Sequence, residues 1–158
     1  MSYFTECWRT TVADKISGCP GIFQTEDGPI TVIGTAEGNV VAFGADGSTL
    51  WRDYVGGDVH GWPVDIKIGE QSTLAIGDDQ GCLHLFSLAG EKLWTASLGT
   101  GTVGWEDTAG ITPWNSISQI FGAGDAVLVV TDRAGQVTMF DAGGEIVWQA
   151  HVSAGGVG

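Results

Sequence analysis

Short runs in which apolar and polar side chains alternate recur along this chain, separated by glycine-rich polar turns. Such neighbouring pairs are Val40 with Val41, Leu83 with His84, and Val137 with Thr138. Alternation with a period of two residues is typical of β-strands, and no stretch of 11 or more residues places apolar side chains at the helical spacings of three and four. Polar turns with glycine between apolar runs favour tight strand connections. The pattern therefore predicts an all-β chain.

The pattern also repeats at a fixed interval. Trp8, Trp51 and Trp94 are each 43 residues apart, and Trp148 follows after 54. Two other series keep these intervals: Phe43, Phe86, Phe140 and Gly38, Gly81, Gly135. A period of about 40 to 45 residues is the length of one four-stranded propeller blade. The tryptophans and glycines of these series are therefore interpreted as structural repeat positions.

Each unit has two short apolar strands, a third strand ending near the tryptophan, and an inner strand that precedes them. The expected inner strands are residues 21–24, 64–68 and 117–121. Four strands in an up-and-down meander form a blade, and blades stack face to face. We therefore predict a partial β-propeller of about three four-stranded antiparallel blades plus one leading outer strand. In this fold a tryptophan covers the turn of the next blade and donates its indole N–H to a backbone carbonyl.

The repeat divides residues 1–158 into successive units. The expected boundaries are an outer strand of a preceding blade over 1–12, blade 1 over 18–56, blade 2 over 61–99, an inserted loop over 100–116 and blade 3 over 117–152. About three blades cannot close a ring by themselves. We favour a piece of a longer propeller, and the alternative is a homo-oligomer whose copies close the ring.

Two units carry a motif that resembles a known family. Gly38–Trp51 and Gly135–Trp148 follow the pattern Gly-x-Val-x-(Ala)-x-(Asp)-x-x-Gly-x-x-x-Trp, in which the first unit lacks the aspartate and the second has Met139 for the alanine. This pattern is similar to the pyrroloquinoline quinone-like, or quinoprotein-type, β-propeller repeat. The middle unit departs from it at Leu85 and Ser87. The resemblance covers nearly the whole chain and is more specific for fold than for function.

The resemblance implies two different functions. One is a non-catalytic module for binding or scaffolding, with a protein partner or further propeller blades, in an extracytoplasmic or periplasmic compartment. The other is a fragment of a dehydrogenase dependent on pyrroloquinoline quinone (PQQ), with its active site in other blades. Quinone and calcium are expected only for the second function, which in this family uses adjacent cysteines that the sequence lacks. We favour the first function, with no cofactor.

Charge and composition exclude several classes of protein. The formal net charge is −13, which disfavours nucleic acid and anionic lipid surfaces as partners. The sequence contains no apolar run of about 18 residues, so membrane insertion is not expected. Its first residues show no basic segment followed by an apolar one, so no signal peptide is predicted. Cys7, Cys19 and Cys82 lack the spacing of a zinc site or a disulfide framework, although a bridge between the first two remains open.

The best candidate for a binding site is the insertion between the second and third units. Loops on rigid scaffolds commonly carry recognition residues. Candidate binding residues are His60, Trp105, Glu106, Asp107, Trp114 and Asn115. Glu37, Asp79 and Asp132 are expected on the same face, where carboxylates suit a cationic ligand or a loosely held metal ion, although such residues more often satisfy turn geometry. No catalytic residue and no metal site are predicted, and His84 is interpreted as a packed or hydrogen-bonded residue.

Overall fold

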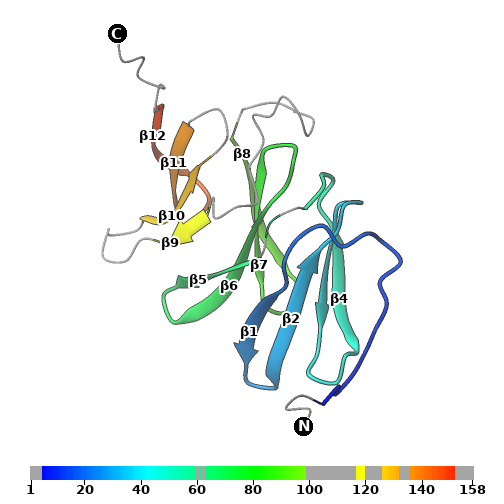
Figure 1. Ribbon diagram of the computed structural model, residues 1–158. Helices are drawn as coiled ribbons and strands as arrows, with labels where there is room; N and C mark the ends of the chain where they lie inside the picture. Colours follow the sequence, from blue (N-terminus) through cyan, green and yellow to red (C-terminus); the bar gives the residue numbers. More distant parts are fainter. Residues whose placement is uncertain are drawn as a thin grey trace.

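The computed structural model describes residues 5–59, 61, 63–98, 117–119, 126–131 and 136–151, and all regular structure in these residues is β. Three antiparallel sheets follow one another along the chain and fan out from a common centre (Figure 1). Sheet 1 contains β1 (Gly21–Thr25), β2 (Gly28–Gly34), β3 (Asn39–Phe43) and β4 (Thr49–Tyr54). Sheet 2 contains β5 (Val64–Ile68), β6 (Gln71–Gly77), β7 (Cys82–Ser87) and β8 (Lys92–Ser97). Sheet 3 contains β9 (Ile117–Gln119), β10 (Ala126–Thr131), β11 (Gln136–Asp141) and β12 (Ile146–His151).

Each sheet is a meander in which strands are ordered as in the sequence, which is the topology of a propeller blade. The same irregularity recurs between the third and fourth strands, where the register shifts at Ala42/Phe43, Leu85/Phe86 and Met139/Phe140. Such bulges increase the local twist of the outer strand. The predicted partial propeller of three four-stranded blades is confirmed.

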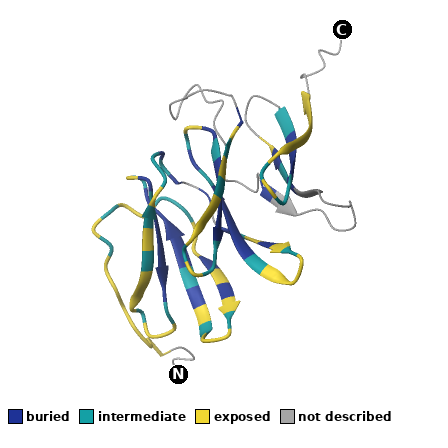
Figure 2. Ribbon diagram, turned by 180° about the vertical axis from the view of Figure 1, so that it is seen from behind, coloured by how far each residue is buried: buried dark blue, intermediate teal, exposed yellow. Residues whose placement is uncertain are grey.

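The core lies between neighbouring sheets, as the dark blue positions in Figure 2 show. We call the surface of a sheet that faces the preceding sheet its leading face, and the opposite surface its trailing face. Between sheets 1 and 2, Val32, Val40 and Ala42 of the trailing face meet Leu74 and Phe86 of the next leading face, and all are fully or almost fully buried. Leu83 and Leu85 meet Leu128 and Phe140 in the same way between sheets 2 and 3. Because apolar side chains occupy both faces, each sheet requires a neighbour on both sides.

A tryptophan on the fourth strand holds each sheet to the next. The Trp51 ring stacks on Phe86 at a centroid distance of 5.9 Å, and its indole N–H donates to Leu88 O at 3.0 Å. The Trp94 ring stacks on Phe140 at 6.2 Å and donates to Ala142 O at 3.0 Å. Both bonds end on the turn between the third and fourth strands of the next sheet.

This turn requires glycine where the indole lies. A methyl group added at Gly90, which has a φ of +89°, would stand 2.5 Å from Trp51 Cγ. One added at Gly144, with a φ of +83°, would stand 2.7 Å from Trp94 Cδ2. Glycine therefore supplies both the left-handed turn conformation and the space for the ring.

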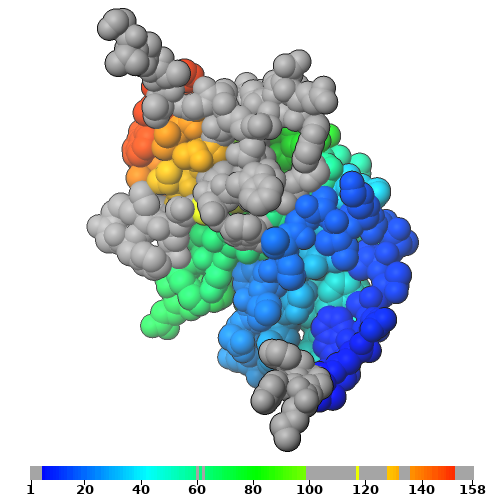
Figure 3. Space-filling model, viewed as in Figure 1, coloured from blue at the N-terminus to red at the C-terminus, as the bar shows by residue number. Residues whose placement is uncertain are grey.

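The leading outer strand expected over residues 1–12 is not present in the described part, because residues 5–12 belong to no strand. A strand needs a partner for its backbone groups, and the third strand of a preceding blade is absent from this sequence. We call residues 5–12 the N-terminal arm. The chain from this arm to β1 runs along the side of sheet 1 (Figures 1 and 3).

The arm nevertheless covers the leading face of sheet 1. Trp8 lies 6.4 Å from Phe43, measured between ring centroids, and a methyl group at Gly47 would meet its Cδ2 at 2.7 Å. Val12 packs against the buried cluster of Ile33, Val41 and Phe43. Trp8 therefore occupies the position that Trp51 and Trp94 take on the next two sheets, without belonging to a blade of its own.

Candidate functional site

The residues predicted to bind a ligand lie outside the described part of the chain. These are His60, Trp105, Glu106, Asp107, Trp114 and Asn115, together with Asp132 of the acidic face and Gly135 of the repeat series. The binding role of the inserted loop therefore stays a prediction.

The turns between second and third strands lie at the same end of the sheets as the connections between sheets, and we call this the loop end. Val55 N–H donates to Gly38 O at 2.8 Å, and Val59 N–H donates to Thr35 O at 3.0 Å. These bonds join the connection between sheets 1 and 2 to the β2–β3 turn. The expected common face for these two kinds of loop is therefore present.

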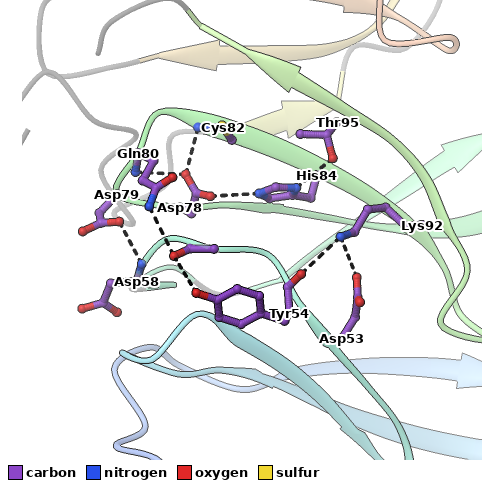
Figure 4. Close-up of polar contacts among 11 residues, drawn as sticks. Asp53, Tyr54, Asp58, Asp78, Asp79, Gln80, Cys82, His84, Lys92 and Thr95 are labelled. Atoms are coloured by element: carbon purple, nitrogen blue, oxygen red, sulfur yellow. Dashed lines mark hydrogen bonds and ion pairs between the residues drawn. The ribbon is translucent and has the colours of Figure 1, made fainter. Parts of the chain in front are cut away.

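A buried polar cluster lies at the loop end of sheet 2 (Figure 4). His84, on the leading face of β7, is 2% exposed, and Asp78, in the β6–β7 turn, is 1% exposed. His84 Nε2 lies 3.0 Å from Asp78 Oδ2, and His84 Nδ1 lies 3.0 Å from Thr95 Oγ1 on β8. With Asp78 as a carboxylate, which only accepts, Nε2 carries the hydrogen of the first bond. Both ring nitrogens are therefore occupied, as the interpretation of His84 as a hydrogen-bonded residue requires.

The order carboxylate, imidazole, hydroxyl also occurs in nucleophilic triads. Here, however, Asp78 Oδ1 also accepts the N–H groups of Gln80 at 3.0 Å and Cys82 at 2.9 Å. The carboxylate thereby closes the β6–β7 turn, and the imidazole joins this turn to the outer strand. Burial and the nearby Asp78 charge raise the pKa of the Cys82 thiol, because both disfavour the thiolate. We assign the cluster to the architecture of the blade.

Sheet 1 has a comparable carboxylate that comes from a different element. Asp14, in the segment before β1, accepts from Asn39 Nδ2 at 2.7 Å and from Arg52 Nη2 at 2.5 Å. The position 43 residues after Asp14 is Gly57, where a methyl group would stand 2.8 Å from Asp78 Cγ. The turn position that Asp78 holds in sheet 2 is Thr35 in sheet 1. Each of the two sheets therefore has one carboxylate at this place, supplied by the connection in sheet 1 and by the turn in sheet 2.

The acids expected to form a binding face are used to hold backbone. Lys15 N–H donates to Glu37 Oε2 at 3.0 Å, and Asp58 N–H donates to Asp79 Oδ1 at 2.8 Å. Glu26, Asp27 and Asp46 are exposed in turns at the other end of the sheets, so negative charge is not confined to the loop end. Within the described residues, no group of three or more His, Cys, Asp or Glu side chains is arranged to hold a metal ion. These residues therefore do not provide the ligand set that calcium and a quinone would need.

A further surface has no cover among the described residues. In β12 all six residues are exposed, and Trp148 is 40% exposed. Because Leu128 and Phe140 point toward sheet 2, strand alternation places Val129, Val137 and Met139 with Trp148 on the trailing face of sheet 3. Val129 and Val137 are partly exposed, whereas the corresponding Ala75 and Leu83 of sheet 2 are fully buried. The sequence reports Trp148 as a repeat position, but only the arrangement of the sheets shows that it is uncovered.

The fold and the docking tryptophans agree with comparisons to known proteins. Residues 79–158 match the family described as outer membrane protein assembly factor BamB. This chain belongs to that family. The resemblance to quinoprotein-type propeller repeats is thereby confirmed, and the BamB family match covers sheet 3 and the third and fourth strands of sheet 2. Comparison with curated protein sequences gave no significant match.

Solved structures place the BamB-like chain among β-propellers. BamB from Moraxella catarrhalis is 17% identical, with a TM-score of 0.63, over 92% of this chain and 40% of that one. BBS1N in complex with ARL6DN is 13% identical, with a TM-score of 0.62, over 92% and 42%. The WD40 repeats of RRP9 are 15% identical, with a TM-score of 0.58, over 90% and 40%. The chain therefore spans about two fifths of the length of these structures, and the likeness concerns the fold.

Among the described residues, no helix is long and apolar enough to cross a bilayer.

Proposed function

We propose that this chain is a non-catalytic protein-binding module of the BamB-like propeller type, located outside the cytoplasm, and that its partner docks on the trailing face of sheet 3. The location rests on membership of a family described as an outer membrane protein assembly factor. The observation that carries the binding role is the exposed Trp148 on an apolar sheet face, beside Ile146 and Val147 at 47% and 52% exposure. Exposed apolar patches on a rigid scaffold are typical of protein interaction sites.

The polar groups support a binding role more than a catalytic one. The buried carboxylate and imidazole of sheet 2 are bonded to the turn and to β8, so they are committed to holding the blade together. Charge-assisted pairs such as Lys92 Nζ with Asp53 Oδ2, at 2.7 Å, likewise join β8 of sheet 2 to β4 of sheet 1. A scaffold fixed in this way presents its uncovered face with little loss of conformational freedom on binding.

Site-specific crosslinking tests the role of this face. A photoactivatable residue at position 147 should capture a partner in an extract of the source cells, and the captured protein, once purified, should be titrated calorimetrically against the chain. Trp148→Ala should weaken binding by about tenfold or more, because tryptophans at the centre of an interface commonly dominate its affinity. Leu93→Ala is the matched control, since Leu93 is an exposed aliphatic residue on β8 whose neighbour Trp94 points to the opposite face.

The quinone-dependent alternative has its own measurement. The purified chain is titrated with PQQ in the presence and absence of calcium. Tight, calcium-dependent uptake would contradict a non-catalytic role, as would partner binding that Trp148→Ala leaves unchanged.

A further inference from the structure

Three tryptophans in this chain dock on the same kind of turn, and a fourth does not. Trp8, Trp51 and Trp94 lie against Gly47, Gly90 and Gly144, each beside the phenylalanine that ends the third strand. Trp148 has the same place on its sheet, but no described turn covers it. The trailing face that contains it is also less buried than the trailing face of sheet 2.

The surface that fits Trp148 is present in the chain itself. The leading face of sheet 1 has Phe43, Ile33 and Val41 in the positions where sheets 2 and 3 receive a tryptophan, and Gly47 leaves space at the turn. A molecule that bears a surface and its complement at separate places associates head to tail. The internal junctions between sheets 1 and 2 and between sheets 2 and 3 already show this contact twice.

The leading face of sheet 1 is occupied by the N-terminal arm, which is not a strand. Trp8 remains 36% exposed, and Val12 is only partly buried. In contrast, β12 is paired with β11 from Gln136↔His151 to Phe140↔Ile146, so Trp148 is held in its docking orientation before any contact forms. A preorganised sheet loses less conformational entropy on docking than a segment without strand pairing.

We propose that two copies of this chain associate head to tail, with Trp148 of one copy displacing Trp8 of the other from Phe43 and Gly47. This inference rests on the proposed function, because it names a second copy as one partner of the trailing face. The N-terminal arm then acts as an internal competitor that keeps the monomer covered. Two copies joined at both junctions form a ring of six sheets, which leaves no open face.

The test is the concentration dependence of molecular mass, measured by sedimentation velocity and by light scattering. The wild-type chain should shift from its monomer mass of 16.5 kDa toward twice that value as concentration rises. Trp8→Ala should tighten association by about tenfold, since it removes the competitor. Trp148→Ala should weaken association by at least the same factor, and Leu93→Ala should match the wild type.

A second variant acts on the receiving turn. Gly47→Ala places a methyl group where any indole would lie, so it should prevent association even when combined with Trp8→Ala. Circular dichroism verifies that each variant is folded. The proposal is wrong if Trp8→Ala stays monomeric at every concentration, or if Trp148→Ala associates like the wild type. A captured heterologous partner that still depends on Trp148 would then leave the proposed function standing and remove only the self-association.

Discussion

The junction between sheets 2 and 3 offers a direct measurement of what one docking tryptophan contributes. Trp94→Ala removes a half-buried indole that stacks on Phe140 and donates to Ala142 O. Replacing a fully buried tryptophan by alanine costs about 3–5 kcal/mol. Partial exposure of Trp94 places its packing loss at the lower end, about 2–3 kcal/mol, and the lost hydrogen bond adds about 1 kcal/mol. We therefore expect the free energy of unfolding to fall by about 3–4 kcal/mol.

Trp148→Ala is the matched control for this measurement, because it is the same substitution at the same repeat position. Trp148 is more exposed and meets no described turn, so its loss should cost less than about 1 kcal/mol. Urea unfolding followed by far-ultraviolet circular dichroism gives both values without relying on tryptophan fluorescence. Trp94→Phe separates the two contributions, since it keeps most of the apolar area and loses the N–H donor. Equal losses for Trp94→Ala and Trp148→Ala would refute docking as the source of stability.

Three further outcomes follow from particular residues. Gly90→Ala should lower the free energy of unfolding by about 2–4 kcal/mol because its methyl group meets Trp51, whereas Gly69→Ala, with a φ of +61° and open space around it, should cost only about 1 kcal/mol; equal losses in urea titrations would assign the whole effect to backbone strain. Hydrogen bonds from Ser48 lower the pKa of Asp46 below its ordinary 3.8, so this carboxylate stabilises the fold above that pH and loses its contribution as pH falls through the lowered pKa; Ser48→Ala should bring the pKa back up in an NMR titration, and an unchanged pKa would contradict the assignment. The raised pKa of Cys82 predicts that, near neutral pH, iodoacetamide alkylates it more slowly than the exposed Cys7 and Cys19, which peptide mass spectrometry can follow; modification of Cys82 first would show that it is neither shielded nor protonated.

Much of this fold is readable from the sequence because one local pattern is repeated three times. Alternation around Val40 and Leu83 predicts the third strands, and the 43-residue interval places a tryptophan opposite the glycine of the next turn. The prediction for residues 1–12 failed in the described part because a matching tryptophan does not provide a partner strand. Periodicity detects side-chain positions, whereas a strand exists only when backbone groups are paired.

The polar cluster of sheet 2 is harder to predict. Asp78 and His84 are separated by a turn, and Thr95 is paired with His84 only through the β7–β8 register. Nothing in their spacing distinguishes this cluster from three unrelated polar residues. Whether a repeated side chain is covered also depends on its neighbours in space, which is why Trp94 and Trp148 are equivalent in the sequence and different in the structure.

The exchange of a carboxylate between Asp14 and Asp78 has a consequence for engineering such repeats. The two positions are separate columns when the units are aligned, so averaging residues column by column would combine an acid from one unit with an acid from another. Asp14 with Asp78 in a single idealised blade would bring two like charges into a space that Gly57 leaves for one side chain. Choosing Thr35 with Gly57 would instead leave the amide hydrogens and cations of that corner without an anion. A workable consensus blade must therefore adopt one complete pair, either acid with threonine or glycine with acid.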